Sequence, residues 1–421
     1  MAVVPPTIDV DDPKMPDAQP IKPAPTGLKK FRVYPTQEQQ TTIKTWMGAV
    51  RWTYNRAVAY LNNEETKGLR TLKHLRSRCV NDEMIKVSSR SKWIGSIPYD
   101  IRDEGVRDAQ KAVGSNMAKQ RIRKKKGLSF SFKLKYRRLK GAFNQTLVIH
   151  SKHWCKRKGM YFDLLGCGGD KLECSESIPS ILQYDVRLIR TRLNEYFIAL
   201  PTCAENHDEN QVLDTSAPCT VSMDPGVRTF MTTYDASGRV VEWGAGDMAR
   251  IHRLCYTIDD IETRCKSDCN HRIRYRLRRS ALRIRRKIRR LIDEIHRKLI
   301  QWLCRTFRVI IIPVFETQQM IKRRNGRARL SSQTAKDMLT WSHFRFRTNL
   351  KHKASIFCET RVIETTEEYT SKTCGICGIL NETLGSKKVF ACEQCGFHSD
   401  RDFNGARNIL IRYLTINRVS P

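Results

Sequence analysis

The sequence is poor in acidic residues and contains no long hydrophobic run. Its 421 residues include 43 Asp and Glu against 77 Lys and Arg, which gives a formal net charge of +34 at pH 7. The longest apolar run, about residues 309–315, is interrupted by Pro313 and is much shorter than the roughly 20 residues that span a bilayer. The first residues offer neither a basic nor an apolar segment, so we expect no secretory signal. These absences argue against a membrane protein, a secreted protein and an ordinary metabolic enzyme.

The excess of positive charge indicates a polyanionic partner, because a chain with this much like charge repels itself. We expect that partner to be nucleic acid rather than an anionic membrane. Hydrophobic residues make up 40% of the chain, which is enough for most of it to fold. The 15 cysteines lie in a large basic chain, where a reducing compartment and metal binding are a better interpretation than a disulfide framework.

Composition and periodicity predict a multidomain α+β protein. Proline-rich residues 1–27 are expected to form a disordered tail. Residues 28–36 have the pattern of a strand, and residues 37–125 are mostly of helical periodicity. Residues 126–215 are rich in strand patterns, and we expect a basic β-barrel that takes 28–36 as one of its strands. Within this region, apolar and cationic residues alternate over 128–140 and predict strands.

The rest of the chain alternates strands and helices, which is typical of an α/β domain. This domain is expected to span residues 216–370 and to resume in residues 400–421, with a Cys-rich insertion at 371–399. The predicted elements are strands over 218–243 with a hairpin turn at 235–238, a helical stretch over 248–307, a strand over 309–315, a helix over 332–358, a strand over 361–369 and a final helix.

The insertion contains the strongest local motif, two Cys-x-x-Cys pairs. Four thiolates at this spacing can reach one tetrahedral ion, and zinc suits four sulfur ligands. Because no coordination position stays open, one structural Zn²⁺ is predicted. Its four ligands are Cys374, Cys377, Cys392 and Cys395. A weaker group of Cys265, Cys269 and His271 is interpreted as ordinary helix residues.

Two aspartates occupy unusual positions at the two ends of the α/β domain. Asp224 lies inside a strand, where a carboxylate without a partner is costly. Asp402 opens the last helix, where taken alone it would more often be an N-cap. Several carboxylates in one domain suit two Mg²⁺ ions, because Mg²⁺ prefers oxygen ligands. A pair of such ions is one known solution for phosphodiester hydrolysis.

A third feature is a strongly basic helix. From His271 to Arg290, eleven of the twenty residues are Arg or Lys and none is acidic. Such a row of like charges is unfavourable unless phosphates lie alongside it. Residues 121–140 are similarly basic. The candidate nucleic-acid contacts are Arg276, Arg279, Arg283, Arg286, Lys124, Lys125 and Lys135.

The motifs, in this order, resemble one known family. The segments VSMDPGVRTFMTTY, PVFETQQM, SQTAKDMLTWSHF, EEYTSKTCGICG and CEQCGFHSDRDFNGARNIL are similar to the nuclease half of TnpB. The segment FRVYPTQEQQTTIKTWMGAVRWTYNRAV is similar to the opening strand and first helix of that family. The resemblance extends to the Fanzor proteins, the eukaryotic and viral relatives of TnpB. Both groups are transposon-associated, RNA-guided DNA endonucleases.

The resemblance implies a fold, partners and cofactors. The implied fold is an RNase H-like (RuvC) nuclease domain interrupted by a zinc-binding, target-nucleic-acid insertion, together with a β-barrel wedge domain into which a helical recognition domain is inserted. The implied partners are a guide RNA from the transposon and a target double-stranded DNA with a short adjacent motif. The implied catalytic cofactors are two Mg²⁺ ions. A monomeric ribonucleoprotein in a nucleus, without a membrane, is expected.

The resemblance also implies catalytic residues. Asp224 matches the family's first catalytic Asp, and Asp402 matches the last, with Asp400 as a weaker alternative. The sequence departs from the common pattern at Pro313, which stands where the middle Glu is usual. In a rearranged subset this Glu lies just before the Tyr-Thr-Ser-Lys run, and Glu367 is then the best match. The alternatives are Glu316, Glu368 and Glu364.

Two functions of other classes compete with a guided nuclease. A nuclease-dead regulator of the same fold would use RNA or DNA binding alone. A DNA-joining transposase would use the RNase H-like fold for strand transfer and would leave joined products.

Overall fold

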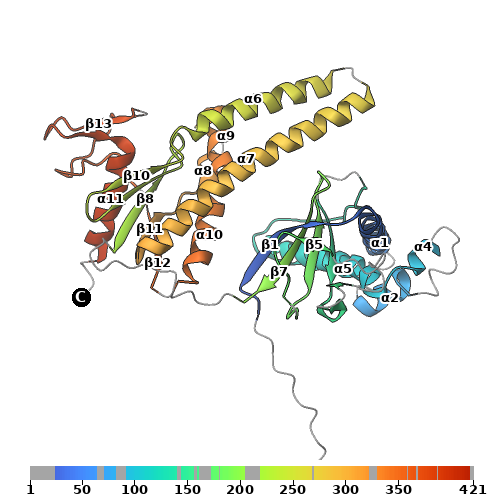
Figure 1. The fold of residues 1–421 in the computed structure, drawn as a ribbon. Coiled ribbons are helices and arrows are strands. Elements are labelled where there is room, and N and C mark those ends of the chain that lie inside the picture. Colours follow the sequence, from blue (N-terminus) through green and yellow to red (C-terminus); the bar gives the residue numbers. More distant parts are fainter. Residues whose placement is uncertain are drawn as a thin grey trace, which may run out of the picture. The chain divides into compact units, whose positions relative to one another are not determined.

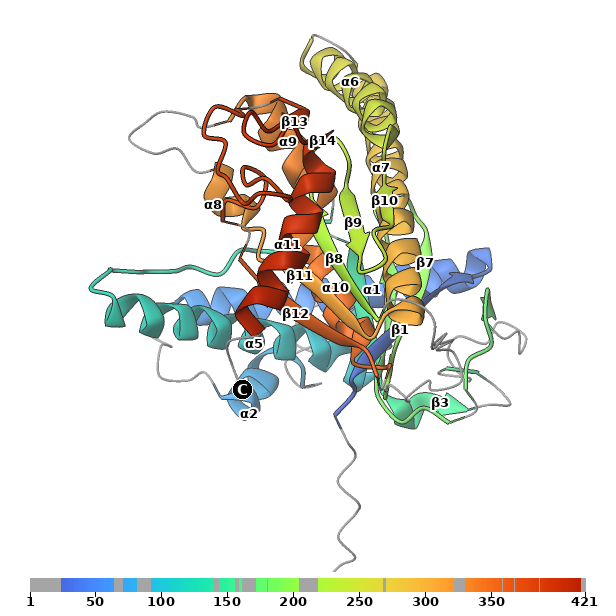
Figure 2. The same ribbon diagram turned by 90° about the vertical axis from the view of Figure 1, so that its left-hand side faces the viewer.

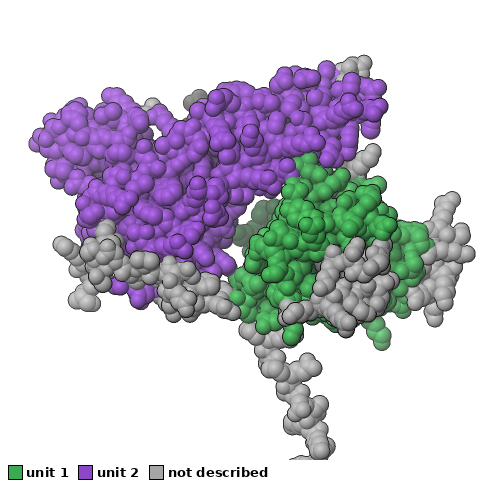
Figure 3. All heavy atoms as spheres, viewed as in Figure 1, with its two compact units in different colours: residues 1–204 green, residues 205–421 purple. Residues whose placement is uncertain are grey.

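The computed structural model describes residues 24–63, 71–81, 92–139, 144–155, 159–160, 172–179, 181–203, 219–267, 270–321, 330–357, 359–366, 368–385 and 387–417. The chain divides into two compact units, residues 1–204 and residues 205–421 (Figure 3). Each unit has a hydrophobic core of its own.

A long helix pair organises the first unit. α1 (Gln37–Asn62) begins at Thr36, whose hydroxyl accepts from the Gln39 N–H while the Gln39 side chain accepts from the Thr36 N–H. α5 (Tyr99–Lys125) packs against α1 at Gly105, where a Cβ would lie 2.1 Å from Thr53 Oγ1. The shorter helices are α2 (Leu72–Cys79) and α4 (Lys92–Gly95). The helical periodicity of this region is therefore confirmed in its described part.

The sheet of the first unit is antiparallel, with strand order β2-β6-β7-β1-β5. Its strands are β1 (Gly27–Tyr34), β2 (Gln145–Ile149), β5 (Glu173–Cys174), β6 (Val186–Arg190) and β7 (Tyr196–Thr202). Phe31 of β1 is opposite Ile198 of β7, so the opening strand does join strands from much later in the chain. A separate pair, β3 (Trp154–Cys155) and β4 (Gly159–Met160), follows a short 3-10 turn. Between the described strands β2 and β5 there is no pairing, so the barrel stays a prediction.

The prediction of strands over 128–140 is wrong for its described part, residues 128–139. This segment is extended, but it pairs with side chains of α1 instead of with a strand. Asn62 donates to the Leu134 carbonyl at 2.9 Å and accepts from the Leu134 N–H at 3.0 Å. Asn55 makes the same pair of bonds with Arg137. The alternating pattern does mark a buried side, since Leu134 is buried. Its backbone N–H and carbonyl groups, however, are hydrogen-bonded by asparagine amides of a helix and not by a neighbouring strand.

The second unit is built on a mixed sheet with strand order β10-β9-β8-β11-β12. β8 (Thr220–Pro225), β9 (Met231–Asp235) and β10 (Val240–Trp243) are antiparallel neighbours, whereas β11 (Val309–Pro313) runs parallel to β8 and to β12 (Arg361–Thr365). The predicted turn at 235–238 is present, with Gly238 at a φ of 88° and its N–H bonded to the Asp235 carbonyl. The predicted strands of this unit are confirmed, except that the strand predicted over 361–369 ends at Thr365 and residues 368–370 form a turn.

Helices cover both faces of this sheet. One face packs on α11 (Arg401–Asn417), which lies across β8 and β11 (Figure 2), and the contact is made by Ile311, Ile409 and Leu410. The other face carries the main core, in which Val221 and Ile312 meet α7 (His271–Thr306) and α10 (His343–Ala354). The strand pleat separates the two faces, because alternate residues of β8 and β11 point to opposite sides.

Two predicted helical stretches are each divided in the structure. The stretch over 248–307 is a hairpin of α6 (Asp247–Lys266) and α7, which run side by side (Figure 1). The stretch over 332–358 is α9 (Ser332–Trp341) followed by α10, with Ser342 between them at a φ of 57°. α8 (Thr317–Ile321) is a short turn after β11. Across the described residues, none of the helices combines the length and the apolar character that crossing a membrane requires.

Two buried histidines should make the second unit sensitive to acid. Burial, followed by the charge of Arg345, lowers the pKa of His296 to about 4, and burial lowers the pKa of His343 to about 3. Both values lie below the ordinary value of about 6.5, so the unfolded chain binds more protons between pH 6.5 and 4 and stability falls as the pH falls. His296 alone should cost about 3 kcal/mol of unfolding free energy by pH 4.

Urea unfolding of the full chain between pH 7 and 4 tests this prediction. His296→Gln should flatten the pH dependence, whereas His271→Gln, at an exposed position on the same helix, should leave it unchanged. Equal pH dependence in all three proteins would show that His296 is not the source of the acid sensitivity.

Candidate active site and metal centre

Asp224 lies in a row of side chains that crosses the sheet. It is opposite Thr232 of β9, and Thr232 is opposite Glu242 of β10. Directly opposed residues of antiparallel strands share a face, so Asp224 and Glu242 face the same side of the sheet. That side is the one covered by α11, because the Ser222 hydroxyl, two residues before Asp224, donates to the Ala406 carbonyl at 2.7 Å.

Two glycines allow Asp224 and Asp402 to converge. Gly405 follows Asp402 by about one turn on α11, and a Cβ there would lie 2.6 Å from Asp224 Oδ2. Gly226 follows Asp224 by two residues, and a Cβ there would lie 3.9 Å from Asp402 Oδ2. The two aspartates that bracket the domain in sequence therefore lie at one place, where the end of β8 meets the first turn of α11.

The carboxylate of Asp402 is not used to cap its helix. Asp400, at the end of β14 (His398–Asp400), caps α11, because its Oδ1 accepts from the Asp402 N–H at 2.8 Å. Burial, followed by the Asp400 charge, raises the pKa of Asp402, while Arg401 and Arg228 act in the opposite direction. Asp402 is thus a partly buried carboxyl crowded by negative charge, an environment in which a bound cation would be stabilising.

The predicted middle carboxylate, Glu367, lies outside the described residues. The chain that follows it is tied to α11, because Arg412 Nη1 donates to the Glu368 carbonyl at 3.1 Å. A Cβ at Gly405 would lie 3.9 Å from the Cα of Ser371, and Gly405 is also the residue against which Asp224 packs. The Glu368 side chain itself is exposed.

Two alternative glutamates lie in different surroundings. Glu364 of β12 pairs with Arg347 Nε at 3.2 Å and with Lys351 Nζ at 2.7 Å, both from α10. It is opposite Ile312, which belongs to the core on the α10 side, so Glu364 points away from the face that carries the two aspartates. Glu316 is exposed beyond the end of β11.

The sheet register shows where Pro313 and Glu242 lie relative to Asp224, which the sequence alone did not show. Ile311 is beside Ser222, so two residues further along these parallel strands Pro313 comes beside Asp224. Proline offers no side-chain ligand there. Glu242, which the sequence analysis missed, shares the face of Asp224 and adds negative charge next to Asp402. Extending the register from the recognised turn at 235–238 would have found it.

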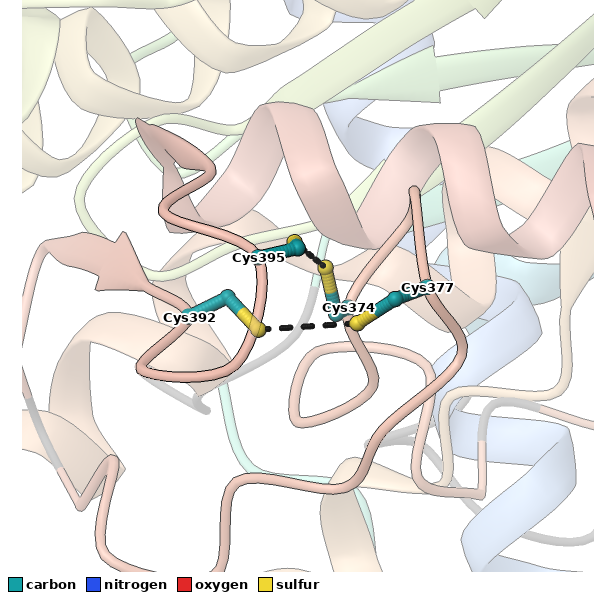
Figure 4. A group of neighbouring side chains, drawn as sticks. All are labelled: Cys374, Cys377, Cys392 and Cys395. Carbon is teal, nitrogen blue, oxygen red and sulfur yellow. Dashed lines mark hydrogen bonds between the residues drawn. The ribbon is translucent and has the colours of Figure 1, made fainter.

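The four predicted zinc ligands come together in the structure. Their sulfur atoms all lie within 4.8 Å of one another (Figure 4), with Cys374 and Cys395 at 3.6 Å and Cys377 and Cys392 at 3.6 Å. The backbone N–H of Cys395 lowers the pKa of Cys392 to about 7, which favours the thiolate that zinc binds. Four sulfurs at this separation fit one tetrahedral Zn²⁺. The weaker group cannot be compared, because Cys269 lies outside the described residues.

The cysteine knuckle is docked on the helix that carries Asp402. Asn404 accepts from the Gly375 N–H at 3.0 Å and donates to the Thr373 carbonyl at 2.7 Å. Asn408, one turn later, donates to the carbonyls of Thr370 and Thr373. Both asparagines are buried, so the knuckle and the first two turns of α11 form one hydrogen-bonded piece.

The predicted nucleic-acid contacts are divided between the two units. Arg276, Arg279, Arg283 and Arg286 follow one another at helical spacing and lie along one face of α7. Arg276 and Arg283 are exposed, and Arg279 donates to the Tyr275 hydroxyl. Lys124 and Lys125 end α5, and Lys135 lies on the extended segment after it; all three are exposed.

Two family models match parts of the chain. One, described as a Cas12f1-like TNB domain, matches residues 343–409, a range that includes the four cysteines and Asp402. The other, described as a helix-turn-helix domain, matches residues 29–67, a range that includes most of β1 and all of α1.

Curated relatives align over nearly the whole chain. A "Putative transposase" of Paramecium bursaria Chlorella virus 1 is 27% identical over 92% of this chain and 87% of its own length. A "TnpB-like protein" of Acanthamoeba polyphaga mimivirus is 25% identical over 91% of this chain and 72% of its own length. The chain is thus similar to TnpB-like proteins along nearly its whole length.

One further relative carries a name that states an activity. A "Putative RNA-guided DNA endonuclease" of Streptomyces pristinaespiralis is 25% identical over 90% of this chain and 88% of its own length. Among solved structures, the Cas12f1 chain of a complex with single-guide RNA and target DNA has 16% identity and a TM-score of 0.31, over 91% of this chain and 98% of that one. A TM-score this low supports no comparison of individual elements.

Proposed function

We propose that this protein is an RNA-guided DNA endonuclease of the Fanzor branch of the TnpB family. In this proposal it binds a transposon-derived guide RNA, recognises a short adjacent DNA motif and cleaves guide-matched double-stranded DNA as a monomeric ribonucleoprotein in a nucleus. Base pairing would supply sequence specificity, as in other guided nucleases. The similarity to relatives named for this activity supports the class of activity, and the net charge of +34 supports nucleic-acid partners.

The convergence of Asp224 and Asp402 is the observation that carries the proposal. They come from the first strand and the last helix of the second unit, and Gly405 leaves room for the Asp224 carboxylate where any other residue would place a Cβ. The donors are carboxylate oxygens, which are the ligands that Mg²⁺ prefers, so the residues fit the implied ion. Asp224, Glu367 and Asp402 would hold two Mg²⁺ ions, which supply activated water and stabilise the leaving oxygen.

Purification of the full chain with its own nucleic acid tests this function. The RNA is sequenced, and a plasmid library that carries the matched target beside randomised flanks is incubated with Mg²⁺ or with EDTA. A discrete RNA together with Mg²⁺-dependent cutting of matched plasmids supports the proposal. Glu367→Ala should abolish cutting, whereas Glu316→Ala, Glu368→Ala and Glu364→Ala should not. Equal binding of random RNA, or no cutting, would refute the proposal.

Pro313 favours a second candidate function, a nuclease-dead regulator that works through RNA or DNA binding. Its position beside Asp224 removes a place from which a third carboxylate could reach the two aspartates. This candidate predicts that a discrete RNA is bound, that matched DNA is bound and not cut, and that Asp224→Ala changes neither affinity.

Gly405→Ala should impair the proposed activity, because the added Cβ would lie 2.6 Å from Asp224 Oδ2 and 3.3 Å from its Cγ. Overpacking of this kind costs about 1–3 kcal/mol and would displace the carboxylate. Gly114→Ala is the matched control, since its Cβ would meet nothing within 4 Å on the exposed side of α5. It should stabilise by about 0.5–1 kcal/mol. Urea unfolding and plasmid cutting measure both effects, and wild-type cutting by Gly405→Ala would contradict the prediction.

A further inference from the structure

The loop between β8 and β9 passes directly beside the two aspartates. It starts at Gly226, whose N–H donates to the Phe230 carbonyl at 3.3 Å and whose position allows no Cβ, since one would lie 2.5 Å from the Thr229 carbonyl oxygen. The same Cβ would lie 3.9 Å from Asp402 Oδ2, so the loop backbone forms one side of the site.

Two buried aromatic side chains hold successive carbonyls of this loop. Trp341 Nε1 donates to the Val227 carbonyl at 2.8 Å, and His343 Nε2 lies 3.1 Å from the Gly226 carbonyl oxygen. Because a carbonyl can only accept, His343 must carry its proton on Nε2 in this contact. Both side chains come from the α9–α10 junction, where Ser342 adopts a left-handed conformation and lets two neighbouring positions face the loop.

These two donors are themselves held rigidly. The His343 ring stacks on Phe230 at 5.1 Å between ring centroids and 16° between planes. Trp341 is fully buried, and its own carbonyl lies 3.0 Å from Nε2 of His296 on α7. The loop is therefore fixed by α7, α9 and α10 together, and not only by the strands that it joins.

The next residue of the loop, Arg228, is exposed. It interacts electrostatically with Asp402 but forms no ion pair with any carboxylate that the structure describes. The other cation beside Asp402, Arg401, donates to the Gly385 carbonyl at 3.2 Å. Asp402 also interacts with the charges of Asp400 and Glu242, and the summed negative charge of these three carboxylates would repel a phosphodiester. A guanidinium is well suited to oppose that repulsion, because its planar fork can bind two phosphate oxygens at once.

We propose that Arg228 binds the phosphodiester group that reacts beside Asp224 and Asp402, and that Trp341 and His343 position the loop that carries it. This inference rests on the proposed nuclease function. Arg228 would be the catalytic cation that touches the substrate, and the two buried aromatic donors would act through the loop backbone.

Single-turnover cutting of a guide-matched plasmid, with the full chain and its co-purified RNA, tests the inference. Arg228→Gln should lower the rate at saturating DNA by about 10²–10³-fold, as expected for loss of a preorganised donor to the reacting group. Arg228→Lys should recover part of the rate, because it keeps the charge and loses the fork. Arg239→Gln, at the exposed turn between β9 and β10, is the matched control and should cut like the wild type.

The affinity for matched DNA should change by less than about tenfold in Arg228→Gln, since one phosphate contact among many is lost.

For the positioning residue, His343→Gln keeps an N–H donor near the Nε2 position, whereas His343→Phe keeps the ring and removes the donor. Rescue of the rate by Gln but not by Phe, at similar melting temperatures, supports a positioning role.

The outcomes separate the two proposals. A wild-type protein that cuts matched DNA, with Arg228→Gln cutting at the same rate, overturns this inference and leaves the nuclease function standing. A wild-type protein that binds RNA and never cuts overturns both. Equal loss of rate in His343→Gln and His343→Phe overturns the positioning role of His343.

Discussion

Asp224→Asn and Asp402→Asn are each expected to lower the cutting of guide-matched DNA by at least about 10³-fold, the effect of losing several kcal/mol of metal-assisted stabilisation. Asparagine keeps the size of the side chain, so the packing of Asp224 against Gly405 is preserved and the charge is what changes. Guide RNA binding and target binding should be retained, because neither aspartate belongs to the basic faces of the chain.

The measurement is single-turnover plasmid cutting in Mg²⁺, together with the affinity for the co-purified RNA. Asp260→Asn is the matched control, since Asp260 is an exposed residue of α6 whose partner is Arg264 on the same helix. Wild-type cutting by either active-site variant would show that these carboxylates are not the metal ligands. Loss of RNA binding together with cutting would instead indicate a structural role.

The cysteine cluster was the easiest part of the site to predict, because ligand spacing is a local property. The four ligands form two Cys-x-x-Cys pairs, and the two cysteines of each pair are separated by only two residues. The basic face of α7 was equally easy to predict, since helical periodicity places Arg276 and Arg283 on one side of the helix. Both features depend on neighbours in sequence and not on how distant segments pack.

The contacts around the aspartates depend on packing and could be predicted only in part. The resemblance implied that Asp224 and Asp402 belong to one site. The role of Gly405 could not be predicted, because a glycine in a helical sequence does not indicate which side chain will pack against it. The resemblance favoured Asp402 over Asp400 as the catalytic residue, but only the hydrogen bond from the Asp402 N–H shows that Asp400 caps α11.

Two of the errors over secondary structure have the same origin. Residues 128–139 alternate like a strand, yet asparagines of α1 satisfy their backbone. The stretch over 332–358 is periodic like one helix, yet it breaks at Ser342 so that Trp341 and His343 can both reach the loop after Asp224. In each case a tertiary hydrogen bond decided between conformations that the local pattern allowed.

Loss of the zinc ligands should have the second-largest effect, because the knuckle and the active-site helix share their hydrogen bonds. Cys377→Ser or Cys392→Ser should reduce the zinc content from about one ion per chain to near zero, since a structural site with three sulfurs loses most of its binding free energy. Without the ion, Thr373 and Gly375 are no longer held against Asn404, a buried neighbour of Asp402.

Cutting should therefore fall by about 10- to 100-fold, the size typical of losing the groups that orient a metal site. Zinc analysis, hydrogen exchange over residues 368–399 and plasmid cutting measure the three consequences together. Cys265→Ser is the matched control, since Cys265 lies on α6 outside the cluster, and it should change none of them. If the zinc variants lose the ion and still cut at the wild-type rate, the knuckle does not support α11. Its docking by Asn404 and Asn408 would then serve target binding alone.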